Sequence, residues 1–407
     1  MSRPARPGPV VVVVGAGQAG VQTADSLRAG GYTGPVVLLG DEPGLPYQRP
    51  PLSKDFIAAG GDPRPLPLRG ERFFADRDID HRPGAVVTAV DRARRTVTLA
   101  SGVEIGYATL VLATGAEPRP LSGPRLAGVH TLRTLADARS LRAALERAHA
   151  VVVVGAGFIG LEFAAVARAR GIDVTVLESA DRVLARAVSA ETGRHLLDVH
   201  RGLGADVRPG TGLARLEECG GVVRAGVDTS GVRHRADLVV AGIGVRPRDG
   251  LAQACGLAVD DGILVDGDLR TSDPSVLAVG DCARFPAGPT GALRRLESVQ
   301  NATDQARHAA AVMLGTAIAS YAAVPWFWSV QGPVTLQIAG LADPDDEAVV
   351  SGDPAGGRFS VLRLREGRLV AVESLNRPAD HVVARRLLAR PDRPTRGELA
   401  ESGFGRT

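Results

Sequence analysis

Two glycine-rich turns carry the strongest chemical signal in this chain of 407 residues. Gly15–Gly20 and Gly155–Gly160 both have the spacing Gly-x-Gly-x-x-Gly, and each joins a run of valines to an alanine-rich stretch. Such a turn lets the backbone approach a pyrophosphate, and the N-terminus of the helix that follows offers unpaired N–H groups to it. One such turn is compatible with an incidental loop in a chain with 50 glycines, but the repeated context predicts two dinucleotide sites.

An acidic residue follows the second apolar run of each repeat. Asp41 comes after Val36–Leu39, and Glu178 comes after Val174–Leu177. A carboxylate at this position accepts hydrogen bonds from the ribose hydroxyls of adenosine and repels a 2′-phosphate, so Glu178 favours NADH over NADPH. The alternative, a solvated carboxylate at a strand end, is weaker at this offset from the glycines.

Lys54 is the only lysine among 48 lysine and arginine residues. It follows Ser53, a residue type that often caps helices, and the turn Arg49–Pro51, so we expect Lys54 to begin a helix. A single lysine in a chain that otherwise uses arginine favours a special role over that of an ordinary surface lysine.

The cysteines exclude thiol chemistry near the first turn. Cys219, Cys255 and Cys282 are odd in number and form no Cys-x-x-Cys pair, and residues 1–218 contain no cysteine. Disulfide oxidoreductases need a pair of redox-active cysteines, and NADH peroxidases and coenzyme A disulfide reductases need one cysteine in the first domain. Cys282 is expected to pack behind a strand end. The pattern predicts a reducing compartment and no disulfide framework.

The bulk composition restricts the partners. The net charge is +3, which predicts neither nucleic-acid nor membrane binding. No apolar run reaches the roughly 18 residues that span a bilayer. The run Val10–Val14 is about half the length of a signal core. These runs predict a cytoplasmic protein. A monomer without a metal ion is also expected, although no residue pattern decides the oligomeric state.

The elements that position these residues form two βαβ units, because continuous valine runs are typical of parallel strands buried on both faces. Two nucleotide units suggest two nucleotides, and a flavin is the natural partner of a nicotinamide. Further strands are expected within Ala85–Ala100 and at Leu110–Ala113, Leu238–Gly244, Val276–Asp281, Val334–Gly340, Arg358–Leu364 and Leu369–Asn376. Helices are expected at Val21–Ala29, Leu135–His149, Leu161–Arg170, Val299–Leu314 and His381–Leu388.

The predicted fold class is α/β, with two Rossmann-like dinucleotide-binding domains and a C-terminal α+β domain. A discontinuous FAD-binding domain is expected at residues 9–117 and 246–324. The NADH-binding domain is expected at residues 118–245 and the C-terminal domain at 325–407.

Several motifs make the chain resemble the FAD-dependent NADH:ferredoxin reductases of oxygenase systems, of the putidaredoxin reductase and biphenyl dioxygenase reductase type. These motifs are Tyr47–Lys54, Ala113–Gly115, Thr134–Ala138, Gly155–Glu162, Thr271–Pro274, Gly280–Ala283, Leu296–Ala302 and Pro325–Trp328. The resemblance extends to about residue 390 and implies a glutathione-reductase-like arrangement of the two nucleotide domains.

The resemblance implies two sets of binding residues. The FAD set is Gly15, Gly17, Ala19, Gly20, Asp41, Arg49, Lys54, Val87, Ala113, Thr114, Gly115, Arg133, Gly280, Asp281, Val299 and Trp328. The NADH set is Gly155, Gly157, Ile159, Gly160, Glu162, Glu178, Gly244 and Glu297.

The resemblance also implies that Lys54 lies beside the flavin N5 and pairs with Glu162, and these two are the expected catalytic residues. A cation there favours the reduced flavin. The alternative for Glu162 is an exposed first-turn carboxylate stabilised by the helix dipole. Of the two tryptophans, Trp328 is expected near the flavin ring and Trp326 in the core. Val330 stands where the family commonly has an aspartate.

The implied activity is hydride transfer from NADH to FAD, followed by delivery of single electrons to an acidic 2Fe–2S ferredoxin. That ferredoxin would serve a cytochrome P450 or a ring-hydroxylating dioxygenase. Arg294, Arg295 and Arg307 are candidate contacts for it. The alternatives are an NADH oxidase, a rubredoxin reductase, or an NADH-sensing flavoprotein similar to apoptosis-inducing factor.

Overall fold

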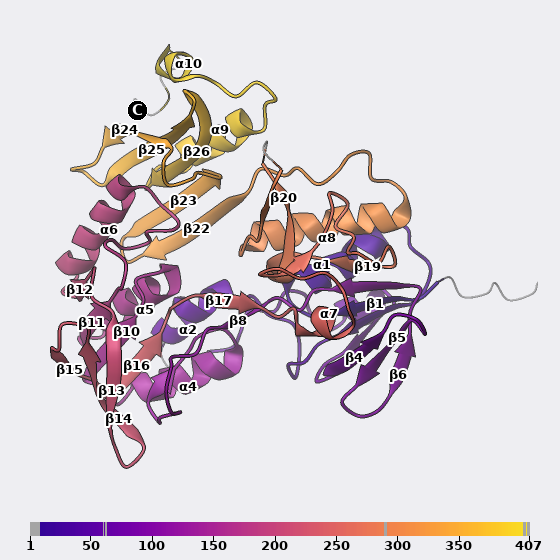
Figure 1. The fold of residues 1–407 in the computed structure, drawn as a ribbon, viewed down its shortest axis with the longest axis horizontal. Coiled ribbons are helices and arrows are strands. Elements are labelled where there is room, and N and C mark those ends of the chain that lie inside the picture. The colour runs from indigo at the N-terminus through magenta and orange to yellow at the C-terminus, as the bar shows by residue number, and fades with distance from the viewer. Residues whose placement is uncertain (1–8, 60, 62, 289–290, 402–403, 405–407) are drawn as a thin grey trace, which may run out of the picture. The chain divides into compact units, whose positions relative to one another are not determined.

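The computed structural model describes residues 9–401 and 404, apart from residues 60, 62, 289 and 290, and the chain divides into two compact units (Figure 1). Unit 1 contains the described residues up to Gln48 together with Leu66–Glu117 and Arg246–Ala323. Unit 2 contains Arg49–Pro65, Pro118–Val245 and the chain from Val324 onward. The finer division of unit 2 into an NADH-binding and a C-terminal domain stays a prediction.

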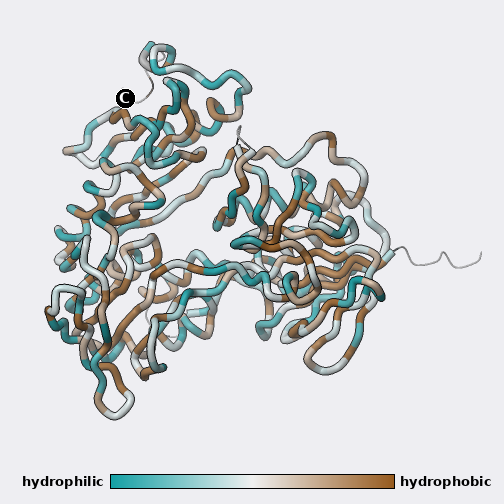
Figure 2. The backbone as a smooth tube through the Cα atoms, in the orientation of Figure 1, coloured by the Kyte–Doolittle hydropathy of each residue, from teal (hydrophilic) through white to brown (hydrophobic). Residues whose placement is uncertain are grey.

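Unit 1 is built on a five-stranded parallel sheet in the order β19-β7-β1-β2-β3. The strands are β1 (Val11–Val14), β2 (Val36–Leu39), β3 (Ile79–Arg82), β7 (Thr109–Leu112) and β19 (Val276–Ala278). Every residue of β1 and β2 is buried, as the continuous apolar runs predict. Figure 2 colours the backbone by hydropathy, and these strands are hydrophobic. Helix α1 (Gln18–Ala29) packs against α8 (Val299–Leu314), whose bounds are those expected from the sequence.

Smaller elements complete unit 1. An antiparallel sheet contains β4 (Val87–Asp91), β5 (Thr96–Leu99) and β6 (Glu104–Gly106). A mixed sheet contains β18 (Ile263–Leu264), β20 (Ala283–Ala287) and β21 (Ala292–Arg294), with β18 parallel and β21 antiparallel to β20. Three short helices are α3 (Phe73–Asp76), α7 (Gly250–Ala254) and the 3₁₀ turn η2 (Gly280–Cys282). The strand expected to reach Asp281 ends at Ala278, because Gly280 has a φ of +80°, which an extended strand does not adopt.

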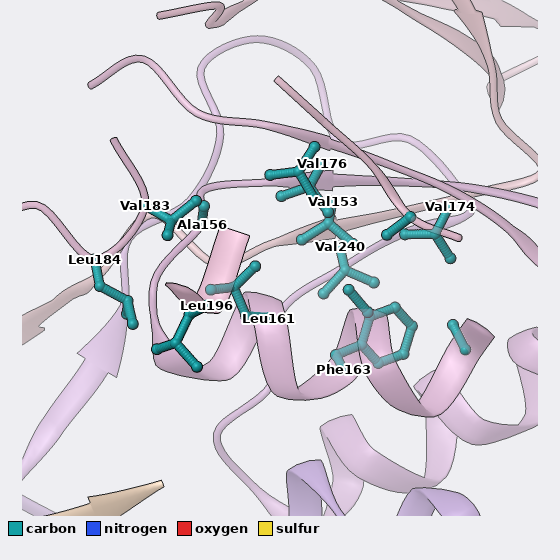
Figure 3. Packing of buried hydrophobic residues seen from close by; sticks show 14 of the residues in the cluster. Val153, Ala156, Leu161, Phe163, Val174, Val176, Val183, Leu184, Leu196 and Val240 are labelled. Atoms are coloured by element: carbon teal, nitrogen blue, oxygen red, sulfur yellow. The ribbon is translucent and has the colours of Figure 1, made fainter. Parts of the chain in front are cut away.

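Unit 2 contains a second five-stranded parallel sheet in the order β12-β11-β10-β16-β9. Its strands are β9 (Val129–His130), β10 (Ala150–Val154), β11 (Asp173–Leu177), β12 (Asp206–Arg208) and β16 (Leu238–Ala241). Its helices are α4 (Leu135–Leu145), α5 (Phe158–Ala169) and α6 (Ala190–Gly202). Leu161 and Phe163 of α5 point toward Val153 and Val240 of the sheet (Figure 3).

Helix α4 ends at Leu145, four residues before the expected His149. The backbone N–H groups of His149 and Ala150 donate to Asp237 Oδ2 at 3.0 and 3.1 Å. The carboxylate of Asp237 thus holds the chain as it enters β10, where a longer helix would not leave these groups available. An antiparallel sheet of β13 (Leu213–Cys219), β14 (Val222–Asp228) and β15 (Arg233–Arg235) lies between β12 and β16 in the chain.

The C-terminal part of unit 2 is an antiparallel sheet in the order β22-β23-β26-β25-β24. Its elements are β22 (Trp326–Gln331), β23 (Val334–Gly340), β24 (Glu347–Asp353), β25 (Arg358–Arg365), β26 (Arg368–Leu375), α9 (Pro378–Leu388) and α10 (Arg396–Glu401). Leu336, Phe359 and Leu375 join the same core cluster as Phe163 of α5, so this sheet shares a core with the nucleotide fold. Helix α9 starts three residues before the expected His381, because Pro378 suits the first helical turn.

Short segments join these parts. The 3₁₀ turn η1 (Pro50–Ser53) and α2 (Asp55–Ala58) belong to unit 2, and Ile57 is buried in its core. Strands β8 (Ala116–Pro118) and β17 (Val245–Pro247) pair where the chain passes from one unit to the other. Among the helices of the described residues, none is long and apolar enough to cross a bilayer.

Candidate functional site: two nucleotide turns and a buried ion pair

The three glycines of the first turn lie in different surroundings. Gly15 has a φ of +108°, and a Cβ there would lie 2.2 Å from the carbonyl oxygen of Ala113. A Cβ on Gly20 would lie 1.8 Å from the carbonyl oxygen of Gly15. At Gly17, by contrast, a Cβ would meet no described atom within 4 Å. The fold itself requires the first and third glycines, whereas the second one leaves space open beside the helix N-terminus.

The second turn repeats this pattern in unit 2. Gly155 has a φ of +100°, and its added Cβ would lie 2.5 Å from the carbonyl oxygen of Gly242. A Cβ on Gly160 would lie 2.2 Å from the carbonyl oxygen of Gly155. A Cβ on Gly157 would make only an ordinary contact of 3.6 Å. Both turns therefore keep their middle glycine free of close contacts within the described protein.

The helices after these turns start in the same way. Gly17 and Gly157 are the N-cap residues of α1 and α5, and no side chain among the described residues caps either helix. Neither helix has an acidic residue in its first turn. Helices α4, α6 and α8, in contrast, are capped by the side chains of Thr134, Ser189 and Ser298. Open N-termini beside glycine turns fit the pyrophosphates of FAD and NADH.

The two acidic residues are held differently. Asp41 Oδ2 in unit 1 lies 2.7 Å from Arg248 Nη1, with both side chains partly exposed. Glu178 in unit 2 accepts hydrogen bonds from the backbone N–H groups of Ala156 and Ala180, at 2.7 and 2.8 Å. The pairing of Asp41 with Arg248 was not foreseen, because the two residues are 207 positions apart and no local pattern connects them.

Most residues of the expected FAD set belong to unit 1. They follow the carboxyl ends of parallel strands: the first turn follows β1, Asp41 follows β2, Ala113–Gly115 follow β7, and Gly280 and Asp281 follow β19. Such an edge is where nucleotides bind in sheets of this type. Val87 is half-buried in β4, and Val299 is the first residue of α8.

The other residues of the FAD set belong to unit 2. They are Arg49, Lys54, Arg133 and Trp328, and Arg49 Nη1 donates to the carbonyl oxygen of Arg133 at 2.8 Å. Ile159 and Gly244 of the NADH set lie there as well. Glu297 belongs to unit 1, where its Oε1 accepts from Arg295 Nη1 at 2.6 Å.

Glu162 and Lys54 form an ion pair in unit 2. Lys54 Nζ lies 2.8 Å from Glu162 Oε2, with side-chain exposures of 19% and 2%. Ser53 Oγ donates to the same carboxylate oxygen at 2.6 Å. Ser329 Oγ donates to Glu162 Oε1 at 2.5 Å, and the backbone N–H of Val330 donates to it at 3.3 Å. The alternative of an exposed first-turn carboxylate is therefore wrong.

Ser53 does not cap a helix, contrary to the sequence prediction. It is the last residue of η1, and Lys54 is the N-cap residue of α2, which has no side-chain cap among the described residues. The hydroxyl of Ser53 is directed to Glu162 instead, because a buried carboxylate is the stronger acceptor. Ser53 and Ser329 were both missed as site residues, since serines carry no distinctive signal in the sequence.

The two tryptophans have different surroundings. The Trp326 ring lies 4.6 Å from the Arg385 guanidinium and 5.7 Å from the His381 ring, and it packs on the C-terminal core. Trp328 is half-buried, 5.8 Å from Trp326 between ring centroids. The Val330 side chain is exposed, and residue 330 contacts Glu162 through its backbone N–H. The replacement of the family's aspartate by valine therefore does not remove this hydrogen bond.

The three cysteines are free thiols far apart in the sequence. Cys282 is fully buried, as expected, and burial raises the pKa of its thiol. Burial also raises the pKa of the Cys255 thiol. Because the thiolate is the reactive form, neither residue is prepared for redox chemistry. Within the described residues, no group of three or more histidines, cysteines or acidic residues could hold a metal ion.

The sequence also matches known families and relatives. The model of the pyridine nucleotide-disulphide oxidoreductases matches residues 9–306, and that of the reductase C-terminal domain matches residues 326–405. Rhodocoxin reductase of Rhodococcus erythropolis is 45% identical over 396 residues, 97% of this chain and 92% of that protein. The chain belongs to the ferredoxin reductases of oxygenase systems. The resemblance seen in the motifs is thereby confirmed.

Other ferredoxin reductases and a related enzyme match nearly as well. Putidaredoxin reductase of Pseudomonas putida is 42% identical, with 91% of this chain and 89% of that protein covered. Rubredoxin-NAD(+) reductase of Pseudomonas putida is 38% identical, with coverages of 90% and 96%.

Solved structures confirm the fold class, with parallel nucleotide-binding sheets and an antiparallel C-terminal sheet. The ferredoxin reductase for the CYP199A2 system of Rhodopseudomonas palustris has a TM-score of 0.94 and 45% identity, covering 98% of each chain. The covalent complex of putidaredoxin reductase with putidaredoxin matches with a TM-score of 0.92 and 39% identity, covering 97% and 96%. The predicted class of activity, a ferredoxin reductase, is thus confirmed at the level of the family.

Proposed function

We propose that this reductase takes electrons from NADH through bound FAD and passes them one at a time to an acidic 2Fe–2S ferredoxin. That carrier would in turn supply a cytochrome P450 or a ring-hydroxylating dioxygenase. The single observation that carries the proposal is the buried pair of Lys54 and Glu162 in a unit that also holds an open dinucleotide turn. Burying two charges costs free energy, so a buried pair on the helix that follows the dinucleotide turn supports a role beyond packing.

The residues of this chain suit the hydride step. When bound, FAD accepts the hydride of NADH and releases the two electrons singly. The Lys54 ammonium, held by Glu162, supplies a fixed positive charge for the side of the cofactor that becomes electron-rich. Residues 1–218 contain no cysteine, which supports direct delivery of electrons to an external carrier.

The choice of NADH rests on Glu178. Its carboxylate is held at the end of β11 by two backbone N–H groups, those of Ala156 and Ala180. Held in that way, it can accept hydrogen bonds from the ribose hydroxyls but repels a 2′-phosphate. A fixed carboxylate discriminates better than a mobile one, because it cannot turn away from the phosphate.

The exposure and ion pairs of three arginines decide which of them remain candidates for contact with the ferredoxin. Arg307 is 62% exposed and forms an ion pair with Asp304, three residues earlier in α8, at 3.2 Å. Arg294 is exposed on β21. The side chain of Arg295 is 9% exposed and is neutralised by Glu297 and Asp261, which argues against it as a docking residue. We propose Arg307 and Arg294 as contacts and a monomeric, cytoplasmic protein.

A second acceptor class is favoured by one observation. The 38% identity to a rubredoxin reductase makes a one-iron carrier a specific competitor of the 2Fe–2S ferredoxin. The remaining alternatives, an NADH oxidase and an NADH-sensing flavoprotein, differ in what happens to the reduced flavin in air.

The test is an anaerobic titration of the purified, FAD-loaded protein with NADH and, separately, with NADPH, followed by flavin absorbance. We expect rapid bleaching by NADH, much slower bleaching by NADPH, and rapid reoxidation by a 2Fe–2S ferredoxin. Faster reoxidation by rubredoxin would move the proposal to that carrier. Rapid reoxidation by oxygen alone indicates an oxidase, and a reduced flavin that persists in air indicates a sensor. A protein that takes up no FAD contradicts the proposal.

A further inference from the structure

A chain of buried hydrogen bonds leads away from Glu162 into the protein. Ser329 Oγ donates to Glu162 Oε1 at 2.5 Å, and Gln331 Nε2 donates to Ser329 Oγ at 2.7 Å. His200 Nε2 lies 2.8 Å from Gln331 Oε1. The chain connects α5, β22 and α6, all of which belong to unit 2.

The four residues of this chain are almost completely removed from water. Glu162 is 3% exposed, and Ser329, Gln331 and His200 are 0% exposed. Ser329 and Gln331 point inward from alternate positions of β22, whereas Val330 between them is exposed. A buried polar group with no partner costs about 1–3 kcal/mol, so the hydrogen bonds that link these four side chains favour a single arrangement. Only the outer ring nitrogen, His200 Nδ1, lacks a partner among the described residues.

The hydrogen bonds of the chain all point the same way. The Gln331 amide oxygen can only accept, so His200 Nε2 must carry the proton and donate. Burial lowers the pKa of His200, which keeps its ring neutral at pH 7. The Gln331 amide then donates to Ser329, and Ser329 donates to Glu162. The hydrogen bonds that link the four side chains are thus directed toward the carboxylate that holds Lys54, and the Gln331 amide also donates to the carbonyl oxygen of Phe158 at 3.4 Å.

The carboxylate of Glu162 is surrounded by donors on both oxygens. Oε2 accepts from Lys54 and Ser53, and Oε1 accepts from Ser329 and from the Val330 backbone. An ionised carboxylate offers about four acceptor positions, so its capacity is used up. The carboxylate therefore has one orientation available, and Lys54 is held in one place.

We propose that Ser329 and Gln331, supported by His200, are positioning residues that fix Glu162 and through it the Lys54 ammonium for the hydride step. The inference rests on the proposed function and deepens it. It adds no chemical step, since NADH still supplies the hydride and the ferredoxin still receives the electrons. Its content is that strand β22 of the C-terminal sheet orients an ion pair formed by Lys54, between η1 and α2, and Glu162 of α5.

A closely matched control exists in the same sheet. Ser360 of β25 is also 0% exposed, and its hydroxyl donates to the Asp380 carboxylate at 2.8 Å. Ser360→Ala therefore removes the same kind of buried hydrogen bond as Ser329→Ala. It does so at a serine that forms no hydrogen bond with Glu162, Ser329, Gln331 or His200. A general loss of packing would affect both variants alike, whereas a positioning role separates them.

The first readout is Lys54 itself, followed without reference to activity. Because Lys54 is the only lysine, protein labelled with isotopically enriched lysine gives a single side-chain NMR signal. We expect Ser329→Ala to shift and broaden this signal and Ser360→Ala to leave it unchanged. A Lys54 signal that responds equally in both variants, or in neither, overturns the proposal.

The second readout is the rate of flavin reduction by saturating NADH in the FAD-loaded protein, measured together with the dissociation constant of NADH. We expect Ser329→Ala to lower the rate constant about tenfold, with little change in NADH affinity, because one hydrogen bond to a charged group is lost. Ser360→Ala should react at the parent rate. Equal rates in the two variants overturn the proposal even if the Lys54 signal moves.

Two further variants keep the test decisive if Ser329→Ala folds poorly. Ser329→Thr retains the hydroxyl and should restore most of the rate, and Gln331→Met removes the amide at similar volume and should slow reduction several-fold. Flavin reduction at the parent rate in Gln331→Met would overturn the role of the hydrogen bonds that lead from Gln331 to Glu162. Failure of the parent protein to be reduced by NADH would instead contradict the proposed function, so the two failures are distinguishable.

Discussion

The two glycine-rich repeats share their turn and their open helix start, and they differ at the fifth residue of the helix. That residue is Gln22 in α1 and Glu162 in α5, and both side chains are buried. The Gln22 amide donates to Ser26 Oγ of its own helix at 3.0 Å, and its oxygen accepts one long hydrogen bond of 3.5 Å from Arg69 Nη2. Glu162 instead meets side chains from η1 and β22. One local fold thus serves two purposes, and distant segments decide which repeat carries an ion pair.

The ends of the second strands show a related difference. Asp41 after β2 pairs with a partly exposed arginine side chain, Arg248, whereas Glu178 after β11 is held by backbone N–H groups. A side-chain partner can turn away when a ligand binds, but a backbone partner cannot. We therefore expect the repeat of unit 2 to select its nucleotide more strictly than the repeat of unit 1.

The largest effect is expected from the glycines of the first turn. Gly15→Ala places a Cβ 2.2 Å from the carbonyl oxygen of Ala113 at a φ of +108°, so we expect misfolding or complete loss of FAD. Gly17→Ala meets no described atom, so the variant should fold normally and hold FAD about 100-fold more weakly, because the methyl group occupies the phosphate space. Melting temperature and FAD titration measure the two effects; normal FAD binding by Gly17→Ala would argue against a phosphate there.

The second effect concerns the fifth helical residue. Glu162→Gln makes this position equal to Gln22 of the other repeat, and it leaves the Lys54 charge without its partner. We expect flavin reduction by NADH to slow about 100-fold, since a misplaced charge costs several kcal/mol in a buried site. Gln22→Met is the control and should reduce at the parent rate. Stopped-flow mixing with NADH measures both, and an unchanged rate in Glu162→Gln would remove the ion pair from the mechanism.

The third effect concerns nucleotide choice. Glu178→Ala removes the carboxylate that repels a 2′-phosphate, so the preference for NADH over NADPH in kcat/KM should fall about 30-fold. Asp41→Asn in the other repeat should weaken FAD retention and leave this preference unchanged. A preference that survives in Glu178→Ala would show that another residue reads the ribose.

The smallest effect is on stability against acid. Burial lowers the pKa of His381 in α9 to about 4, with a smaller contribution from Arg385. The folded ring stays neutral, while the unfolded ring takes up a proton below its ordinary pKa of about 6.5. Stability contributed by this residue is therefore present above pH 6.5 and is lost as the pH falls toward 4.

Replacing His381 by Phe tests that dependence. Between pH 7 and pH 5.5 we expect the parent protein to lose about 1 kcal/mol more of its free energy of unfolding than His381→Phe. Urea unfolding at the two pH values measures the difference. Parallel losses in parent and variant would mean that His381 is protonated in the folded protein.

The elements of the fold were largely predictable because they rest on local patterns. The valine runs before both turns became β1 and β10, and α8 has its expected bounds. Errors arose where a side chain or a backbone angle from the surroundings decides the boundary. Asp237 ends α4 early, and the φ of Gly280 ends β19.

The candidate site was predictable only in part. The spacing of the glycines and the family motifs pointed to Lys54, Glu162 and Glu178. The partners of these residues were not predictable: Ser329 lies 167 positions from Glu162, and the hydrogen bond between them depends on how β22 is packed. Ser53 was predicted to cap a helix, because capping depends only on neighbouring residues. Its hydrogen bond to Glu162 could not be predicted, because the two residues are distant in the sequence.

The most direct test of the account is reduction of a 2Fe–2S ferredoxin by NADH, without oxygen, by the parent protein and by a cysteine-free variant. The variant carries Cys219→Ser, Cys255→Ser and Cys282→Ala, which removes all three thiols of the chain. Electrons that pass from FAD straight to the carrier need no thiol, so both proteins should reduce the ferredoxin over many turnovers at similar rates. A parent protein that leaves the ferredoxin oxidised, or a variant that keeps its FAD and fold but loses turnover, would contradict the account.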